Sequence, residues 1–518
     1  MATPSLAMIP SAYADSKVYS VLPNNGDGDF TFNRDSSATR VGQNGLIQTV
    51  GFFGNELITN GDFATDSDWT KQAGWTISGG TANCDGTANN ALRQNFSLPV
   101  GTLRIKFDVT ARTQGSVNLW INKPAFTQLI SADAVGSYEV DVVTTSGANN
   151  VFFYSASNFN GSIDNVSVQQ ILGDQPRLNY DINANGQVQS CPSLLLEPAS
   201  TNLFPYSEDF SQSVWAKNSV GSASAPVVTL NYATSPDGTQ NASRLQLEVS
   251  GSSSSDKSFI ENTQTLDGSS TYTLTFYIKS NNGVNQNLIF LQNSVSGNAI
   301  TATNEWIRIE QSVTSNTTNA RGFGLMALGN IQQSVDVLIF AAQIEEQSYA
   351  TSYIPTLNGA SQTRAAETCF GAGTAATFNS IEGVFYCEIA ALSNTNSFED
   401  LSFSDGTSNN KIQFFLSGTN SITARVTAGG STQFNHSYTS SDVTQFTKYA
   451  IKYKVNDFSM YVNGVQQSVG TSGSTFSANT LNTIIINDGN ISDLEGKIRD
   501  IRVFNEALTD AQLKALTT

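Results

Sequence analysis

The chain has 518 residues and a formal net charge of −17, with 26 lysines and arginines against 43 aspartates and glutamates. At usual domain sizes, this length predicts roughly three to five domains. Charged residues make up 13% of the chain, which is about half their usual share. A surface that follows nucleic-acid phosphates or anionic lipids needs clustered cations, and the chain has no basic run, so the composition excludes both kinds of partner.

Asparagine, serine, threonine, glycine and glutamine take the place of the missing charge. These residues favour turns and strands with a polar outer face over exposed helices held by Lys/Glu pairs. The composition therefore predicts an all-β fold of tandem antiparallel β-sandwiches with few helices. No apolar run reaches the roughly 18–20 residues that span a bilayer, so we expect no membrane insertion.

Residues 1–51 are rich in turn residues and too short to fold alone. Apolar side chains are scattered between Leu6 and Pro23, so we expect this segment to attach the chain to a larger body. The stretch NNGDGDF, from Asn24 to Phe30, superficially resembles an oxygen-rich calcium loop. It lacks the terminal glutamate of an EF-hand, which favours a turn.

Residues 52–172 contain runs that alternate between apolar and polar side chains, such as the run from Leu103 to Val109. Alternation of this kind predicts strands with one buried face, and turn residues every ten or so positions fit a β-sandwich. An irregular linker (residues 173–202) leads into residues 203–368, which repeat the pattern and predict a second jelly roll.

The two predicted jelly rolls open in the same way, with an Asp-Phe dipeptide shortly before Trp69 in the first and Trp215 in the second. We interpret them as two copies of one architecture. Trp215 is expected in the core of the second.

Residues 369–518 predict a third sandwich that ends in a short helix. Within it, Asn463-Gly464 lies between two alternating runs and supplies the positive φ angles of a type I′ hairpin turn. The residues predicted to form the capping box and the hydrophobic staple of the terminal helix are Thr509 with Gln512 and Leu508 with Leu513.

Candidate catalytic groups are few. The single histidine, His436, has no G-x-S-x-G motif near it, so we expect it in a surface loop rather than beside a nucleophile. With 43 acidic residues, counting alone does not rule out a carboxylate pair for glycoside hydrolysis, but nothing in the sequence marks one. The cysteines, which show no C-x-x-C spacing and are expected to be buried free thiols rather than zinc ligands, are Cys84, Cys191, Cys369 and Cys387. We therefore expect a protein that is not an enzyme.

The first and third predicted sandwiches carry motifs of known families. The opening LITNGDF…W of residues 57–69 and the closing IDNVSV of residues 163–168 resemble a carbohydrate-binding-module jelly roll of the family 4/9 type, which pairs these two strands. Residues 370–518 resemble a concanavalin/laminin-G-like sandwich through the motifs GVF, YVNG and GKIRDIRVF.

The stretches between the sandwiches resemble a recurrent module of tailed-bacteriophage virion proteins. Its pieces are SATRV…GLI, PRLNYD, CPSLLLEPASTNL and QIEEQSYATSYIPT…TRAAE, within residues 37–47, 176–181, 191–203 and 343–367. In that module GLI leads almost directly into PRL. Residues 52–172 therefore look like a jelly roll inserted into a phage scaffold.

The resemblance to carbohydrate-binding modules implies two kinds of site in the first jelly roll. Sugar rings stack on exposed aromatic side chains, and the candidates, each of which could equally belong to the core, are Trp69, Trp75, Trp120 and Tyr154. Jelly rolls of this type often hold a structural calcium ion between their first and last strands, and Asp62 and Asp164 fall in the matching motifs. The alternative for these two aspartates is that they are ordinary surface acids.

Together the resemblances imply a non-enzymatic bacteriophage virion structural protein, a head or tail fibre or a capsid decoration protein. Its expected partners are other virion proteins of the capsid or tail and host surface glycans, and it is expected to form a homo-oligomer such as a trimer. Residues 1–20 lack the pattern of a signal peptide, which fits a virion assembled in the host bacterial cytoplasm. The alternatives are a phage tail-associated polysaccharide-degrading enzyme and a secreted bacterial carbohydrate-binding adhesin.

Overall fold

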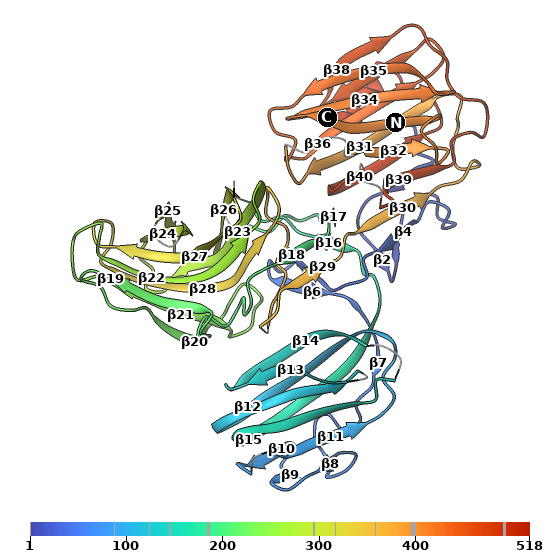
Figure 1. Ribbon diagram of the computed structural model, residues 1–518. Coiled ribbons are helices and arrows are strands. Elements are labelled where there is room, and N and C mark those ends of the chain that lie inside the picture. Colours follow the sequence, from blue (N-terminus) through green and yellow to red (C-terminus); the bar gives the residue numbers. More distant parts are fainter. Residues whose placement is uncertain are drawn as a thin grey trace.

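The computed structural model describes residues 2–87, 89–123, 125–144, 147–183, 187–293, 296–315, 317–357, 359–394, 400–489 and 494–518. Within these ranges the chain forms antiparallel β-sheets and, as its helix, α1 (Asp510–Thr517). This confirms the predicted all-β fold with a short C-terminal helix. Three sandwiches surround a small central region (Figure 1). No helix in the described part of the chain is long and apolar enough to cross a membrane.

The first jelly roll is built on two long strands, β12 (Gly101–Asn122) and β15 (Asn150–Gly173), which pair with each other. Bulges interrupt this pairing between Lys106 and Ser116, and Gly115 there adopts a φ of 70°. Each strand therefore bends and serves both layers of the sandwich. The other strands are β7 (Phe52–Glu56), β8 (Thr70–Lys71), β9 (Trp75–Ser78), β10 (Thr81–Asp85), β11 (Ala91–Asn95), β13 (Phe126–Ala132) and β14 (Gly136–Thr144).

The middle sandwich has two separate five-stranded sheets, ordered β19-β22-β27-β24-β25 and β20-β21-β28-β23-β26. Their strands are β19 (Trp215–Val220), β20 (Val227–Ala233), β21 (Ala242–Glu248), β22 (Lys257–Leu266), β23 (Ser270–Ser280), β24 (Gln286–Asn293), β25 (Ser296–Ala302), β26 (Ile307–Ser315), β27 (Asn319–Leu328) and β28 (Ser334–Glu345). Trp215 is fully buried between the two sheets, as predicted.

The first jelly roll and the middle sandwich share a local structure at their openings. The indole Nε1 of Trp69 donates to the carbonyl of Asn60, nine residues earlier, over 3.0 Å. Trp215 donates in the same way to the carbonyl of Tyr206, also nine residues earlier and at 3.0 Å. Asn60 and Tyr206 both have a φ of 52°. The repeated Asp-Phe…Trp motif therefore encodes the same buried turn in both sandwiches.

The C-terminal sandwich contains strands from three separate parts of the chain. Its strands are β1 (Leu6–Met8), β2 (Tyr13–Ala14), β3 (Lys17–Val18), β4 (Phe30–Asn33), β16 (Arg177–Asn179), β17 (Ser193–Leu196), β30 (Thr368–Ala372), β31 (Gly383–Ala391), β32 (Asp400–Ser404), β33 (Lys411–Gly418), β34 (Ser421–Ala428), β35 (Ser431–Thr439), β36 (Thr447–Tyr453), β37 (Phe458–Val462), β38 (Val465–Gly470), β39 (Thr483–Asn487) and β40 (Gly496–Phe504). Strands β1 and β17 pair with β40, and β4 pairs with β30.

The N-terminal segment is therefore a part of this sandwich. Leu6 and Met8 are fully buried in its core, where they are not available to anchor the chain to another body. At the far end of the sandwich, Asn463 and Gly464 have φ angles of 44° and 80°, which confirms the predicted hairpin turn.

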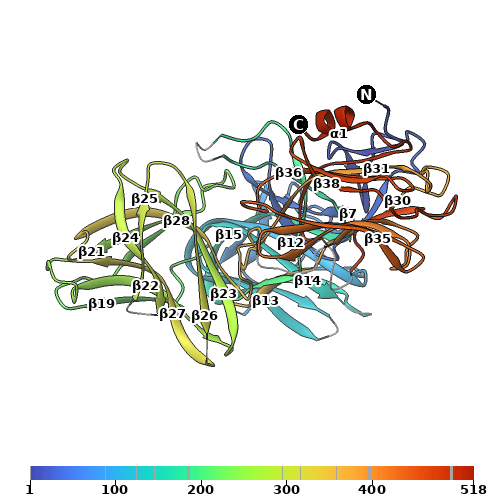
Figure 2. The ribbon, with the colours of Figure 1, turned by 90° about the horizontal axis from the view of Figure 1, so that it is seen from above.

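Helix α1 lies on the outside of the C-terminal sandwich, close to the N-terminus (Figure 2). The Thr509 hydroxyl accepts from the backbone N–H of Gln512, whose side chain accepts from the backbone N–H of Thr509 over 2.9 Å. Leu508 and Leu513 are buried against the sheet. The predicted capping box and the burial of both staple leucines are confirmed.

Two smaller predictions are wrong. Cys191 is an exposed free thiol, because it lies in the linker ahead of β17, whereas the other three cysteines are free and buried, as predicted. His436 lies in strand β35 rather than in a loop. Residues 24–28 form turns, as expected for the NNGDGDF stretch.

Two small sheets fill the centre of the molecule (Figure 1). Strand β5 (Ala38–Val41) pairs with β6 (Ile47–Val50), and β18 (Ser200–Asn202) pairs with β29 (Gln362–Arg364). We call this region, made of residues 34–50, 197–202 and 350–367, the hub.

Candidate functional site

An aromatic surface lies on the outer face of the sheet that contains β13, β12, β15 and β11. Trp120 on β12 is opposite Phe152 on β15, and their rings stack with centroids 6.0 Å apart and planes 16° apart. Phe126 on β13 meets Phe152 edge-on at 5.5 Å and is 64% exposed. We call Trp120, Phe126 and Phe152 the aromatic platform.

Strand alternation explains why Trp120 faces outward. Its neighbours Leu119 and Ile121 are fully buried in the core of the first jelly roll, so Trp120 must point to the opposite face. Tyr154 lies two residues after Phe152 on β15 and therefore shares this face, opposite Asn118. The structure thus brings two of the four predicted aromatic residues, Trp120 and Tyr154, onto one surface.

Polar groups flank the aromatic platform. The Asn118 amide donates to the Gln128 side chain over 3.3 Å and accepts from the Ser131 hydroxyl over 2.8 Å. The indole Nε1 of Trp120 has no hydrogen-bond partner among the described residues. This face therefore combines apolar rings with amide groups, the two kinds of group that contact a sugar.

Trp69 and Trp75 are core residues and not platform residues. They are 6% and 4% exposed, and their indole N–H groups donate to the carbonyls of Asn60 and Asn90. A sugar cannot reach either ring, so the predicted role of both as platform residues is wrong. The physical reason is that both rings fill the space between the two layers of the first jelly roll.

The opening and closing motifs of the first jelly roll do lie together. The backbone N–H of Val166 donates to the carbonyl of Gly61 over 2.9 Å. Asp62, however, is exposed and accepts only a long 3.4 Å bond from the N–H of Ala64, and Asp164 accepts from the N–H of the next residue. No group of three or more metal-binding side chains occurs among the residues described, and the calcium ion stays a prediction.

The side chain that joins these two motifs is Glu56. Its Oε1 accepts from the N–H groups of Ile58 (3.0 Å) and Val168 (2.7 Å), and its Oε2 accepts from the Ser167 hydroxyl (2.6 Å). Hydrogen bonds to a carboxylate are stronger than neutral ones, so Glu56 can join the two strands without a cation. Nothing in the sequence pattern singles out this residue.

A buried ionic cluster lies in the hub and includes Arg177 from the adjoining strand β16. Arg177 forms a bidentate pair with Glu367 and also bonds Glu197 over 2.7 Å. Arg364 bonds Glu197 over 2.9 Å, and Arg34 bonds Glu367 over 2.7 Å. None of the five side chains is more than 4% exposed. We call these five residues the ionic cluster.

The ionic cluster keeps its glutamates charged. Burial alone would raise the pKa of Glu197, but the Arg177 and Arg364 guanidiniums outweigh that effect and hold the pKa at about 2. For the same reasons, the pKa of Glu367 is lowered by Arg177 and Arg34. An unpaired charge in such a place would be costly, so each partner depends on the others.

The linking motifs supply most of this cluster. PRLNYD contributes Arg177, CPSLLLEPASTNL contributes Glu197, and TRAAE contributes Arg364 and Glu367. Sequence reasoning identified the motifs but not their contact. The available signal was the presence of charged residues in apolar stretches of a chain that is poor in charge.

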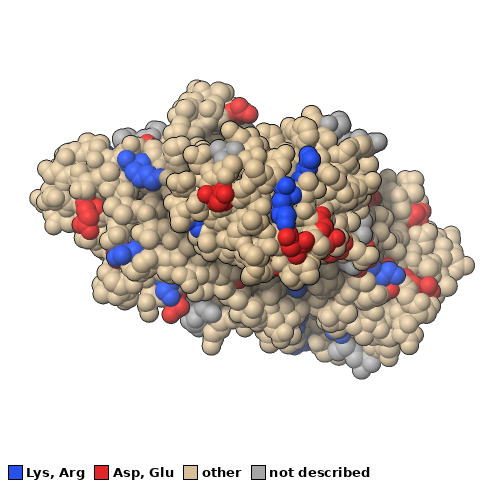
Figure 3. Space-filling model, turned by 90° about the horizontal axis from the view of Figure 1, so that it is seen from below, with Lys and Arg blue, Asp and Glu red and all other residues tan. Residues whose placement is uncertain are grey.

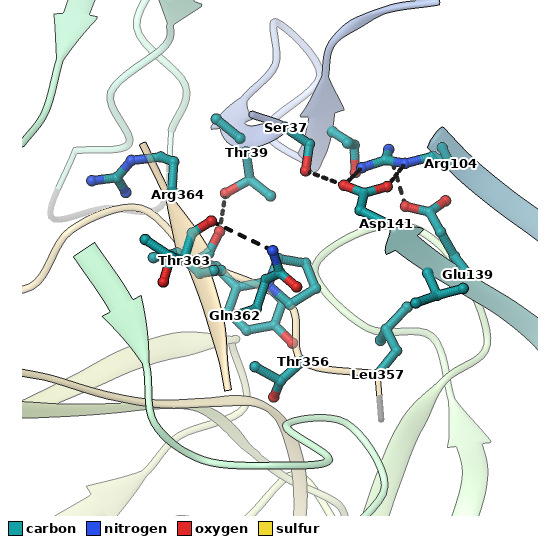
Figure 4. A pocket seen from close by; sticks show the side chains of 16 residues that line it. Ser37, Thr39, Arg104, Glu139, Asp141, Thr356, Leu357, Gln362, Thr363 and Arg364 are labelled. Atoms are coloured by element: carbon teal, nitrogen blue, oxygen red, sulfur yellow. Dashed lines mark hydrogen bonds and ion pairs between the residues drawn. The ribbon is translucent and has the colours of Figure 1, made fainter. Parts of the chain in front are cut away.

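The first jelly roll touches the hub at a small pocket of about 50 Å³ (Figure 4). There Arg104 forms a bidentate pair with Asp141 and a second ion pair with Glu139. The Ser37 hydroxyl of the hub donates to Asp141 over 2.7 Å. Because these charged groups are already paired with one another, we interpret this pocket as a contact between the first jelly roll and the hub and not as a ligand site.

A larger cleft of about 920 Å³ separates the first jelly roll from the middle sandwich. Its carboxylates are Asp108, Asp133, Glu139, Glu208, Asp209 and Asp237. Glu208 accepts from the Tyr353 hydroxyl (3.0 Å) and from the Asn241 amide (3.1 Å). Burial, together with the nearby Asp237, raises the pKa of Glu208 to about 8. On the face that Figure 3 shows, charged side chains are sparse and scattered.

Several solved structures are similar to parts of this chain. The CBM40 module of Ruminococcus gnavus IT-sialidase, in a structure titled as bound to α2,3-sialyllactose, is 14% identical, covers 27% of this chain and 83% of its own, and has a TM-score of 0.24. Domain 4 of a GH43 extracellular arabinanase from Geobacillus stearothermophilus is 14% identical, with 30% and 73% covered and a TM-score of 0.25. The tandem CBM22 domains of a Paenibacillus barcinonensis protein are 11% identical, with 57% and 98% covered and a TM-score of 0.23. Likenesses at this level do not assign a ligand.

A comparison with curated proteins finds no match. The family comparison is more specific. Residues 389–514 match the family model described as the concanavalin A-like lectin/glucanases superfamily. This part of the C-terminal sandwich is therefore similar to concanavalin A-like, laminin-G-type domains, as the sequence motifs implied.

Proposed function

We propose that this protein is a non-enzymatic glycan-binding structural protein and that its first jelly roll binds sugar on the aromatic platform. The observation that carries this proposal is the row of outward-facing rings in which Phe126 is exposed and Trp120 and Phe152 are half-buried.

The chemistry of the aromatic platform suits a sugar. The C–H face of a pyranose stacks on an aromatic ring, and the rings of Trp120 and Phe152 are nearly parallel, so they present an extended stacking surface. The exposed amide of Gln128, whose oxygen accepts from Asn118, offers hydrogen bonds to sugar hydroxyls. Exposing Phe126 costs free energy in water, which a bound ligand would recover.

We place this glycan-binding protein in a tailed-bacteriophage particle, as a fibre or decoration protein of the head or tail. The support is the resemblance of the linking motifs to phage virion proteins, together with the convergence of three of those motifs on the ionic cluster. Its partners would be neighbouring virion proteins and glycans of the host surface.

The test of glycan binding compares single variants of the full chain. A glycan array identifies a ligand, and calorimetry then measures its affinity for the wild type, Trp120→Ala and Phe126→Ala. We expect each variant to bind at least tenfold more weakly, because a lost stacking contact is worth about 1.4 kcal/mol. Tyr232→Ala, which removes an exposed ring from the middle sandwich, is the matched control and should bind normally. Equal binding by all variants would place the ligand elsewhere.

A second candidate function is glycan hydrolysis in the cleft between the first jelly roll and the middle sandwich. Glu208 favours it, because a carboxyl with a pKa of about 8 is protonated at neutral pH and can act as a general acid, and other carboxyl groups line the same cleft. Release of reducing ends from a bound polysaccharide, abolished in Glu208→Gln, would establish this activity. If no reducing ends are released from any polysaccharide that the chain binds, only the binding function remains.

A further inference from the structure

A second large cavity, of about 410 Å³, lies between the hub, the middle sandwich and the C-terminal sandwich. Its walls include β5 of the hub, the start of β26, residues 350–353 and the beginning of β40. This cavity is distinct from the aromatic platform, which lies on the first jelly roll.

The cavity gathers cations in a chain that has few of them. Arg40, Arg308 and Lys497 all line it, although the whole chain has only 26 lysines and arginines. The acidic residues among its lining are Asp181 and Glu197. Glu197 is already paired with two arginines of the ionic cluster.

Arg308 has a guanidinium that is only partly satisfied. Its Nη1 donates to the carbonyl of Thr351 over 2.7 Å, and its Nη2 donates to the Thr275 hydroxyl over 3.0 Å. Its Nε is buried and has no partner among the described residues, and Arg308 forms no ion pair within that part of the chain. Arg308 therefore brings to the cavity a positive charge that no carboxylate balances in the described part of the chain.

Arg40 repeats this situation from the hub side of the cavity. Its Nη1 lies 3.3 Å from the Tyr13 hydroxyl, and its guanidinium lies over the Tyr13 ring at 5.8 Å. Its Nε is also buried without a partner in the described ranges, where no carboxylate pairs with Arg40. Two guanidiniums that lack carboxylate partners therefore line one cavity, in a protein with 43 acidic residues.

Lys497 adds a third positive group. It pairs with Asp181, whose carboxylate also lies 3.5 Å from Arg499, and Arg499 in turn lies 3.8 Å from Glu388. The balance of charge in the cavity is positive. In a partly buried site the potential of such a group is screened less than at an open surface.

We infer that this cavity binds an anionic group, a carboxylate or a phosphate, carried by a sugar-sized molecule. Guanidinium donors match the oxygens of both groups in geometry and charge. The cavity has the volume of a small-molecule site, which is about 300–1,000 Å³. The half-buried rings of Tyr180 and Tyr277 line it as well and provide ring surfaces for the rest of the ligand.

Calorimetry on the full chain tests this inference with D-glucuronate, inorganic phosphate and neutral glucose as probes. We expect at least one anionic probe to bind, glucose not to bind, and affinity to fall as sodium chloride is added. Arg40→Gln and Arg308→Gln should each weaken binding at least tenfold. Arg321→Gln, which changes an arginine elsewhere on the middle sandwich, and Trp120→Ala are the controls and should bind as the wild type does.

The pattern of binding decides the outcome. Binding of glucuronate alone identifies a carboxylated sugar, and binding of phosphate alone identifies a phosphoryl group. Arg308→Lys keeps the charge and should retain more affinity than Arg308→Gln, while thermal unfolding confirms that both variants are folded. If neither anion binds, or if both glutamine variants bind as tightly as the wild type, the inference is overturned.

Discussion

The first jelly roll and the C-terminal sandwich are joined to the rest of the molecule in opposite ways. Every strand of the first jelly roll comes from one continuous stretch of chain, which enters at β7 and leaves at the end of β15, and these two strands are paired with each other. Its direct bonds to other regions include Ser37 to Asp141 and Asn231 to the carbonyl of Val135.

The C-terminal sandwich is not a continuous stretch. Strand β40 alone pairs with β1, β17 and β31, which are separated by hundreds of residues. Its core includes Leu6 from the N-terminal segment and Leu194 from the linker between the other two sandwiches. The first jelly roll is therefore an insert. The C-terminal sandwich and the hub, which we call the frame, are built from segments near the start, the middle and the end of the chain.

Deletions give the largest expected effect. Replacing residues 53–172 with a short Gly-Ser linker should leave the frame folded, because no strand of the remaining sheets is lost. Removing residues 2–33 should prevent the C-terminal sandwich from folding, since that deletion takes away β1 to β4 and exposes its core. Thermal unfolding by circular dichroism measures both. The first jelly roll and the middle sandwich have cores of their own, so the second deletion should keep only part of the transition, and retention of the whole transition would contradict this view of the frame.

The ionic cluster should give the next largest effect. Glu367→Gln leaves Arg34 and Arg177 buried without their shared carboxylate, so the free energy of unfolding should fall by about 3–5 kcal/mol. Asp336→Asn, which breaks the partly exposed pair with Arg244, should cost about 1 kcal/mol or less. Urea unfolding measures both variants, and equal losses would show that the cluster does not stabilise the frame.

Two glutamates should give opposite responses to pH. Glu208, at the edge of the cleft beside the insert, has a pKa raised to about 8. The folded state therefore holds its proton more tightly, and stability should fall as pH rises from about 4.5 to 8, by an amount on the order of 4 kcal/mol. Glu197 of the frame has a pKa of about 2, so its contribution is lost only as pH falls from about 4.5 towards 2.

Urea unfolding of the wild type and of Glu208→Gln at pH 5 and pH 8 measures the first of these responses. The variant cannot ionise, so its stability should change less between the two pH values than that of the wild type. The same pH dependence in both proteins would assign the effect to other groups.

The smallest expected effect concerns the helix cap of the frame. Thr509→Ala removes the hydroxyl that accepts from Gln512, which should lower the stability of the C-terminal sandwich by about 1 kcal/mol. Thr432→Ala, at an exposed position on β35, is the control. Urea unfolding measures both, and a loss in the control equal to that in Thr509→Ala would show that the cap is not the cause.

Local features of the structure could be predicted from the sequence because their causes are local. The alternation from Leu103 to Val109 predicts a half-buried strand, and all its apolar members are buried. The capping box at Thr509 and the hairpin at Asn463 depend on residues only one to three positions apart. Each of these follows from backbone chemistry within a few residues.

Features that depend on distant contacts could not be predicted. The pairing of β1 with β40 joins residues nearly 500 positions apart, and no local pattern encodes it. Trp69 has polar neighbours in the sequence, Asp68 and Thr70, yet its ring is in the core. Trp120 has apolar neighbours, Leu119 and Ile121, yet it lies on the platform, because strand alternation turns it to the opposite face. The ion pairs of the ionic cluster could not be predicted either, because they also join residues that are far apart in the sequence.

The pairing of β1 with β40 also has a mechanical consequence. The two strands are antiparallel, with Leu6 opposite Val503 and Met8 opposite Ile501. A force that pulled Ser5 away from Phe504 would act at one end of this contact and open its hydrogen bonds one after another, in the manner of a zipper. We expect β1 to peel away at low load, before the insert or the middle sandwich carries any tension.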